Sequence, residues 1–187
     1  MRIISGQYKG RNLIGPLDKN TRPLKDLTKE SIFNILHHSK KISFTFKDTK
    51  VLDLFSGVGS FGIECLSRGA GYVTFIDNHP QALKILKKNL LNFKIEKSFK
   101  ILEKNILKDL SFNEVKLNFD IIFIDPPFKE KNLLKIISNI DQENFLNPDG
   151  IIIVHRNKKY KDMFPVNFRI IEEKIYGISK IIFGNFI

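Results

Sequence analysis

Cysteine is almost absent from this sequence, which has one, Cys65, and there is no tryptophan. A single cysteine cannot form a disulfide within the chain, and Cys65 and the four histidines lack the spacing of metal ligands. No apolar run approaches the roughly 20 residues needed to cross a bilayer, and the first residues lack a signal-peptide pattern. We therefore expect a soluble, cytoplasmic protein without a membrane or metal partner.

Positive charge is abundant and unevenly distributed. The 187 residues carry a formal net charge of +11, of which +7 lies in residues 1–50, where eleven Lys and Arg face four acids. Such a segment favours a polyanion, because each neutralised phosphate releases counterions. A lysine-rich surface that only faces solvent is the alternative, above all for the four lysines between residues 40 and 50. The candidate nucleic-acid contacts are Arg2, Lys9, Arg11 and Arg22.

The hydrophobic pattern alternates between strands and helices over most of the chain. Apolar runs predict core strands at residues 50–54, 72–77, 99–102, 119–125 and 150–155. Helical patterns fall at about 60–68, 79–92, 106–110 and 130–140. Two final β-rich segments, 168–176 and 180–186, predict an antiparallel hairpin. This order indicates an α/β fold, a Rossmann-like, doubly wound and mostly parallel sheet of the class I methyltransferase type.

The first 40 residues have a different pattern. Residues 2–5 and 11–14 predict two short strands joined by a turn at Gly10. A loop follows, and from about 26 to 38 the apolar residues repeat at helical spacing. We therefore divide the chain into a nucleic-acid-facing extension at 1–40, made of a hairpin, a loop and a helix, and a methyltransferase domain at 41–187.

A glycine-rich loop follows the first core strand. The stretch VLDLFSGVGSFGIE at 51–64 runs from an apolar strand through Gly57 and Gly59 into a helix. These glycines let the backbone approach a ligand, and the helix N-terminus directs its N–H groups to the same place. With Gly62 they satisfy G-x-G-x-x-G, which alone fits a nicotinamide dinucleotide equally well.

Carboxylates near the strand ends favour S-adenosylmethionine as the cofactor. Asp53 comes just before the glycine loop, where it would repel a pyrophosphate and attract the ammonium and sulfonium groups of this methyl donor, with Phe55 in register beside it. Asp77 follows about twenty residues after the loop, the spacing at which such folds bind ribose hydroxyls. Asn105 is placed for the adenine edge. Simpler roles stay open for the three polar residues, as a turn residue, a helix N-cap and a loop residue respectively.

The tetrapeptide Asp125-Pro126-Pro127-Phe128 follows the fourth core strand, at the edge where open α/β sheets bind ligands. An exocyclic purine amine is a poor nucleophile, because its lone pair is delocalised into the ring, so acceptors must hold its hydrogens and direct the lone pair. The Asp125 carboxylate and the Pro126 carbonyl can accept them, and Phe128 can stack on a splayed base. We predict methyl transfer to a base nitrogen, although a proline pair can also simply end a strand.

Several segments together resemble the RsmD family of ribosomal RNA guanine-N2 methyltransferases. They are MRIISGQYKGR at the start, TRP at 21–23, IFNIL at 32–36, LDLFSGVG at 52–59 and DPPF at 125–128. The N-terminal segments single out this family, whereas the core motifs mark only the wider methyltransferase class. The resemblance implies methyl transfer from S-adenosylmethionine to guanine N2 of small-subunit (16S) ribosomal RNA, free or in its assembling particle, with RNA bound partly by the N-terminal hairpin and loop.

The chain departs from the family pattern at two places. The usual Thr-Arg-Pro-Thr-x-Asp-Arg reads TRPLKDL at 21–27, with Leu24 and Leu27 in place of a hydroxyl and an arginine, and Asp77 stands where a glutamate is common. Another acceptor, such as adenine N6 or a protein glutamine, is an alternative, although its enzymes usually carry Asn-Pro-Pro-Tyr. A non-catalytic RNA-binding assembly factor and a nicotinamide oxidoreductase are the others. The oligomeric state is open, with a monomer favoured.

Overall fold

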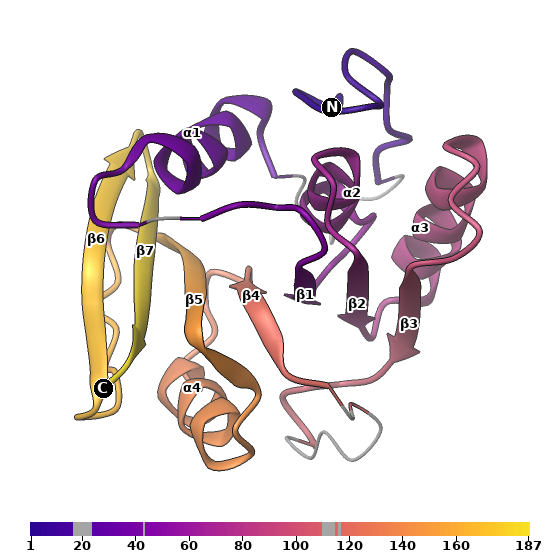
Figure 1. Cartoon of the computed structure of the whole chain (residues 1–187). Helices are drawn as coiled ribbons and strands as arrows, with labels where there is room; N and C mark the ends of the chain where they lie inside the picture. The colour runs from indigo at the N-terminus through magenta and orange to yellow at the C-terminus, as the bar shows by residue number, and fades with distance from the viewer. Residues whose placement is uncertain (17–23, 43, 110–114, 116) are drawn as a thin grey trace.

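A computed structural model describes residues 1–16, 24–42, 44–109, 115 and 117–187 (Figure 1). These residues form a seven-stranded sheet in the order β3-β2-β1-β4-β5-β7-β6. The strands are β1 Lys50–Leu54, β2 Tyr72–Asp77, β3 Phe99–Glu103, β4 Phe119–Ile124, β5 Leu146–Asn157, β6 Phe168–Tyr176 and β7 Ser179–Phe186. The helices are α1 Asp26–His38, α2 Ser60–Ser67, α3 Pro80–Asn92 and α4 Leu133–Gln142. The neighbouring strands from β3 to β5 pair in parallel, and β7 is antiparallel to both β5 and β6.

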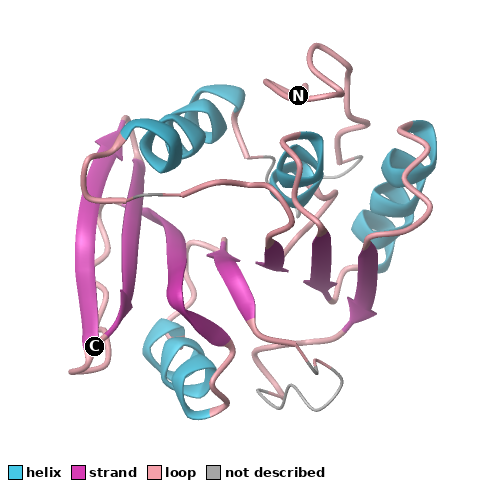
Figure 2. Cartoon of the chain, in the orientation of Figure 1, coloured by secondary structure: helices cyan, strands magenta, loops and turns pink. Residues whose placement is uncertain are grey.

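Helices cover both faces of the sheet (Figure 2). The helices α1, α2 and α3 lie on one face and α4 on the other. Because successive strand residues point to opposite faces, Val51 joins the core cluster under α1 to α3, and Leu52 joins the cluster under α4. The stacked rings of Phe61 on α2 and Phe123 on β4, with centroids 4.0 Å apart, fix α2 over the centre of the sheet. This confirms the predicted α/β fold with its terminal antiparallel hairpin.

Some predicted elements differ from the structure. The helix predicted at 106–110 is wrong, because residues 106–108 form a turn that the Asn105 side chain caps, while residue 110 lies outside the described residues. The strands predicted at 2–5 and 11–14 shrink to a single antiparallel bridge between Arg2 and Asn12. No helix in the described ranges is long and apolar enough to span a bilayer.

Residues 1–14, the N-terminal segment, are held on α2 and α3 by two buried side chains. The carboxylate of Glu64 accepts the backbone N–H groups of Ile4 at 2.8 Å and Ser5 at 2.9 Å. The Asn89 amide pairs with both backbone groups of Ile14, accepting its N–H at 2.8 Å and donating to its carbonyl at 3.1 Å. Paired backbone groups of this kind avoid the cost of burial without a partner. The segment is therefore built into the helical layer.

A buried charge cluster supports the same contact. Lys29 on α1 donates to the Arg2 carbonyl at 2.6 Å and lies 3.5 Å from Glu64, and neither side chain is exposed. Burial lowers the pKa of Lys29, while the carboxylate of Glu64 opposes that shift. Gly6 completes the fit, because its φ of 81° is left-handed and an added Cβ would lie 1.8 Å from the Ser67 carbonyl oxygen.

Candidate active site

Three carboxylates from separate parts of the sequence meet at the carboxyl edge of the sheet. Asp53 lies near the end of β1, Asp77 ends β2 and Asp125 follows β4. Together they line a cavity of about 320 Å³, at the point where the strand order reverses between β1 and β4. Other predicted site residues also line it, namely Phe55, Gly57, Pro126 and Phe128. The structure thus brings together most of the predicted cofactor and catalytic residues.

The glycine loop has the backbone that its sequence predicts. Phe55, Gly57 and Gly59 all have positive φ, at 61°, 53° and 84°. Gly59 is the N-cap of α2 and does not line the cavity, and a Cβ added there would lie 2.3 Å from a methyl carbon of Leu86 on α3. Its role is therefore to let α3 pack closely beneath the loop.

Asp77 ties the end of β2 to the glycine loop. One carboxylate oxygen accepts the Gly57 N–H at 2.7 Å and the other accepts the His79 N–H at 2.8 Å. The N-cap of α3 is His79, whose Nδ1 accepts the Ala82 N–H at 3.3 Å, so Asp77 is not the helix cap. Each carboxylate oxygen has a second lone pair, so Asp77 keeps acceptor capacity for a ligand hydroxyl.

Asp53 is a buried carboxyl at the floor of the cavity. It is 1% exposed, and it accepts the backbone N–H of Gly62 on α2 at 3.0 Å. Burial raises its pKa well above the usual range, and the neighbouring carboxylates of Asp125 and Asp77 add to that rise against the opposing Gly62 bond. A cationic ligand group at this position would favour the charged form of Asp53.

Asn105 lies outside the residues that line the cavity. Its side-chain oxygen accepts the backbone N–H groups of Leu107 at 3.0 Å and Lys108 at 3.2 Å. This is the local turn that asparagine commonly forms. Contact between Asn105 and an adenine edge stays a prediction.

The sequence analysis missed a histidine that holds the catalytic tetrapeptide. His155 on β5 is 2% exposed, and its Nδ1 lies 2.9 Å from Oδ1 of Asp125. Its Nε2 lies 2.9 Å from the Ser179 hydroxyl at the start of β7. The Phe128 ring meets the imidazole edge-on, with centroids 5.9 Å apart.

The next residue, Arg156, holds the backbone of the same loop. Its guanidinium donates to the carbonyls of Pro127 at 3.3 Å and Glu130 at 2.7 Å, and to the Asp162 carboxylate at 2.8 Å. Arg156 is 2% exposed. A signal for both residues was present, since a His-Arg pair ends an otherwise apolar strand that is predicted to lie at the same sheet edge as Asp125.

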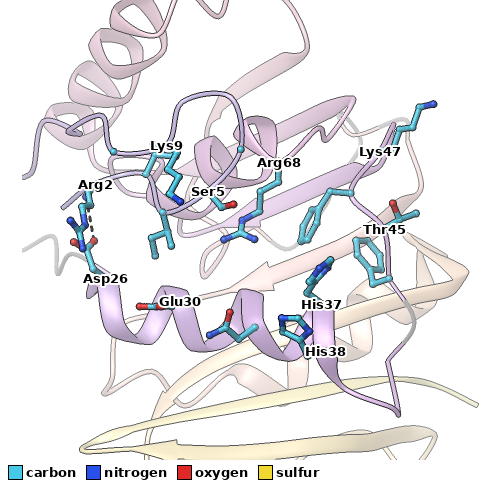
Figure 3. Close-up of a pocket in the computed structure, with 17 residues that line it drawn as sticks. Arg2, Ser5, Lys9, Asp26, Glu30, His37, His38, Thr45, Lys47 and Arg68 are labelled. Atoms are coloured by element: carbon cyan, nitrogen blue, oxygen red, sulfur yellow. Dashed lines mark hydrogen bonds between the residues drawn. The ribbon is translucent and has the colours of Figure 1, made fainter.

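The predicted basic contacts do not share one environment. Exposed Arg2 and Lys9 line a second, larger cavity of about 880 Å³, between the N-terminal segment and α1 (Figure 3). Arg11 instead donates to the Asn92 carbonyl, and its guanidinium lies 4.4 Å from the centre of the Phe93 ring, so it tethers the segment to the end of α3. Arg22 lies outside the described residues.

The two departures from the RsmD pattern also separate in space. Leu24 is buried and lines the cavity at the carboxyl edge, whereas Leu27 is 69% exposed on α1. Among the residues described, no group of three or more His, Cys, Asp or Glu side chains could hold a metal ion.

A parallel sheet with an antiparallel edge hairpin, a glycine loop and three carboxylates around one cavity defines this protein as a class I methyltransferase. Its fold is similar to the solved structure of yhhF from Escherichia coli, provisionally described as a methyltransferase, with a TM-score of 0.81, 27% identity, and coverage of 98% of this chain and 96% of that one.

The chain belongs to the RsmD family, whose model, described as "Conserved hypothetical protein 95", matches residues 1–185. It is 33% identical over 179 residues to "Ribosomal RNA small subunit methyltransferase D" of Haemophilus influenzae, covering 95% of this chain and 90% of the relative. It is 36% identical over 160 residues to YlbH of Bacillus subtilis, provisionally described as an rRNA methyltransferase, covering 85% and 84%.

Proposed function

We propose that this enzyme transfers a methyl group from S-adenosylmethionine to the exocyclic N2 of a guanine in small-subunit ribosomal RNA. The observation that carries the proposal is the convergence of Asp53, Asp77 and Asp125 on one cavity beside the glycine loop. The names of the relatives support ribosomal RNA as the substrate, and the RsmD resemblance supports guanine N2.

The methyl donor is bound by the β1 and β2 side of the cavity. Asp77 accepts ribose hydroxyls next to the backbone of Gly57, and Asp53 faces the cationic methionine end. The raised pKa of Asp53 means that its charged form is costly in the protein alone. A bound ammonium or sulfonium offsets that cost, whereas a pyrophosphate increases it, which disfavours a nicotinamide dinucleotide.

The methyl acceptor is bound on the β4 side. The Asp125 carboxylate and the Pro126 carbonyl accept the two amine hydrogens and aim the nitrogen lone pair at the methyl carbon. The new N–C bond forms as the S–C bond breaks, and sulfur keeps the electron pair of that bond. The methylated nitrogen then releases one proton to the Asp125 carboxylate or to water. Phe128 supplies an aromatic face for the splayed base.

The larger cavity provides the RNA surface of residues 1–40. Its lining contains Arg2, Lys9, Lys47 and Arg68 against Asp26 and Glu30, a net excess of positive charge that attracts phosphates. Figure 3 shows Arg2 and Lys9 on one side and Glu30, His37 and His38 of α1 on the other. Leu24 lines the cofactor cavity and Asp26 lines this one, so the two lie next to each other. One RNA strand can therefore reach both.

The test is methyl transfer to ribosomal RNA from a host that lacks the enzyme. Small-subunit RNA and assembled small subunits are incubated separately with S-adenosylmethionine, and the digested nucleosides are analysed by mass spectrometry. We expect N2-methylguanosine with at least one substrate and none with Asp125→Ala. Formation of N6-methyladenosine instead, or no methylation of either substrate by a protein whose melting temperature rises with S-adenosylhomocysteine, would contradict the proposal.

A further inference from the structure

We propose that His155 is a positioning residue for methyl transfer, which holds the Asp125 carboxylate in the ionised form and in the orientation that the amine requires. The inference rests on the proposed function, because it assigns to Asp125 the role of amine acceptor. It adds a residue from β5, a strand that contributes no residue to the cofactor half of the cavity.

The geometry joins three strands in a line of polar contacts. Asp125 follows β4, His155 lies on the neighbouring β5, and Ser179 begins β7 on the far side of β5. The contacts are 2.9 Å from Asp125 Oδ1 to His155 Nδ1 and 2.9 Å from His155 Nε2 to the Ser179 hydroxyl. The Asp125 side chain is 14% exposed and the His155 side chain only 3%. Asp125 therefore stands between the cavity and a buried support.

The partners also determine the histidine tautomer. An ionised carboxylate can only accept hydrogen bonds, so His155 must carry a proton on Nδ1 and donate it to Asp125. Neutral His155 then presents Nε2 as an acceptor, which the Ser179 hydroxyl satisfies by donating. Donation to Asp125 stabilises the charged form of its carboxyl against the neighbouring buried Asp53.

Orientation is the larger part of this effect. A carboxylate at a partly exposed loop position can rotate about its Cβ–Cγ bond, and an amine acceptor must stay aligned with the methyl carbon. Misplacement by about 1 Å in an active site can reduce the rate on the order of 100-fold. The His155 bond fixes one carboxylate oxygen, while the Arg156 bonds to Pro127 and Glu130 fix the backbone that follows.

The experiment compares three substitutions at one site. His155→Phe keeps a ring and removes both nitrogens, His155→Asn places an amide N–H near the position of Nδ1, and His155→Gln carries its amide farther out, toward Nε2. We expect His155→Phe to lower kcat about 10-fold to 100-fold. The KM for S-adenosylmethionine should change less than about 2-fold, because the donor is bound elsewhere. His155→Asn should recover most of the lost rate, and His155→Gln much less.

A double-mutant cycle tests whether His155 acts through Asp125. In an Asp125→Ala background, His155→Phe should reduce single-turnover methyl transfer by less than about 2-fold, because no carboxylate is left to position. Full additivity of the two effects would overturn the inference. So would an unchanged kcat in His155→Phe, or equal losses in the Asn and Gln variants.

Folding and the proposed function are separated by two controls. S-adenosylhomocysteine binding and the melting temperature are measured for every variant, and if His155→Phe does not fold, the Asn and Gln comparison decides. If Asp125→Ala alone keeps the wild-type rate, the proposed role of Asp125 is wrong. If Asp125→Ala is slow while His155→Phe is fast, only the positioning role of His155 is wrong.

Discussion

The N-terminal segment and the carboxyl edge of the sheet both depend on carboxylates, and they use them differently. Glu64 is fully buried and surrounded by protein donors, namely the N–H groups of Ile4 and Ser5 together with Lys29 and Arg68. Asp125 is supported from one side by His155 and lines a cavity on the other. Carboxylates enclosed by their own chain hold the fold together, while those at a cavity wall are left to meet a ligand.

The largest expected effect is on stability, at Glu64. Glu64→Ala removes the acceptor of two buried backbone N–H groups and leaves Lys29 buried without its carboxylate partner. Breaking a buried ion pair from one side costs about 3–5 kcal/mol. We expect a loss of that size in the free energy of unfolding, measured by urea denaturation. Glu30→Ala, at an exposed position on α1, is the control. A loss below about 1 kcal/mol would show that the N-terminal segment needs no such anchor.

At Asp125 we expect a large loss of rate with little loss of stability. Asp125→Ala should lower single-turnover methyl transfer about 100-fold or more, as for loss of a positioned base or donor, at saturating cofactor. Asp125→Asn keeps one carbonyl acceptor and should retain more activity if the carboxylate only orients the amine. Equal loss in both variants would indicate that Asp125 also takes the proton. Near wild-type rates in Asp125→Ala would leave it as an ordinary strand-end residue.

Asp53 should behave oppositely to Glu64 when its charge is removed. Its pKa in the folded protein is raised above that of the unfolded chain, so between these two values the folded state binds more protons and stability falls as pH rises. Asp53→Asn should therefore raise the melting temperature of the free protein near pH 7. It should also weaken S-adenosylhomocysteine binding about tenfold, through loss of one charge-assisted contact. Tighter binding, or a lower melting temperature with binding intact, would contradict this.

The smallest expected effect concerns the basic residues of the larger cavity. Arg2→Ala and Lys9→Ala should each flatten the log–log dependence of RNA affinity on salt by roughly 0.7 to 0.9 for each lost phosphate contact. Lys135→Ala, at an exposed position on α4 across the sheet, should leave the slope unchanged. Equal slopes in all three variants would mean that Arg2 and Lys9 only face solvent.

The carboxyl edge was more predictable from the sequence than the N-terminal segment. A strand, a glycine loop and a helix occur within residues 51–64, so local pattern was enough to place Asp53 and Gly57. The strand ends then had to meet at one edge, because parallel strands share their carboxyl side.

The anchors of the N-terminal segment could not be predicted, because they join residues far apart in the sequence. Glu64 bonds to Ile4 across 60 positions and Asn89 to Ile14 across 75. The same holds for His155 and Asp125, 30 positions apart. Arg11 shows the converse error, since a positive charge count cannot distinguish a phosphate contact from a guanidinium that packs on Phe93.

Lys29 connects these two regions directly. Its ammonium donates to the Arg2 carbonyl in the N-terminal segment and to the hydroxyl of Ser60, which lines the cofactor cavity, at 3.3 Å. A displacement of Ser60 on cofactor binding is therefore passed through one side chain to the backbone beside Arg2. Thermodynamic reciprocity then applies: whatever factor the bound cofactor adds to RNA affinity, bound RNA must add to cofactor affinity.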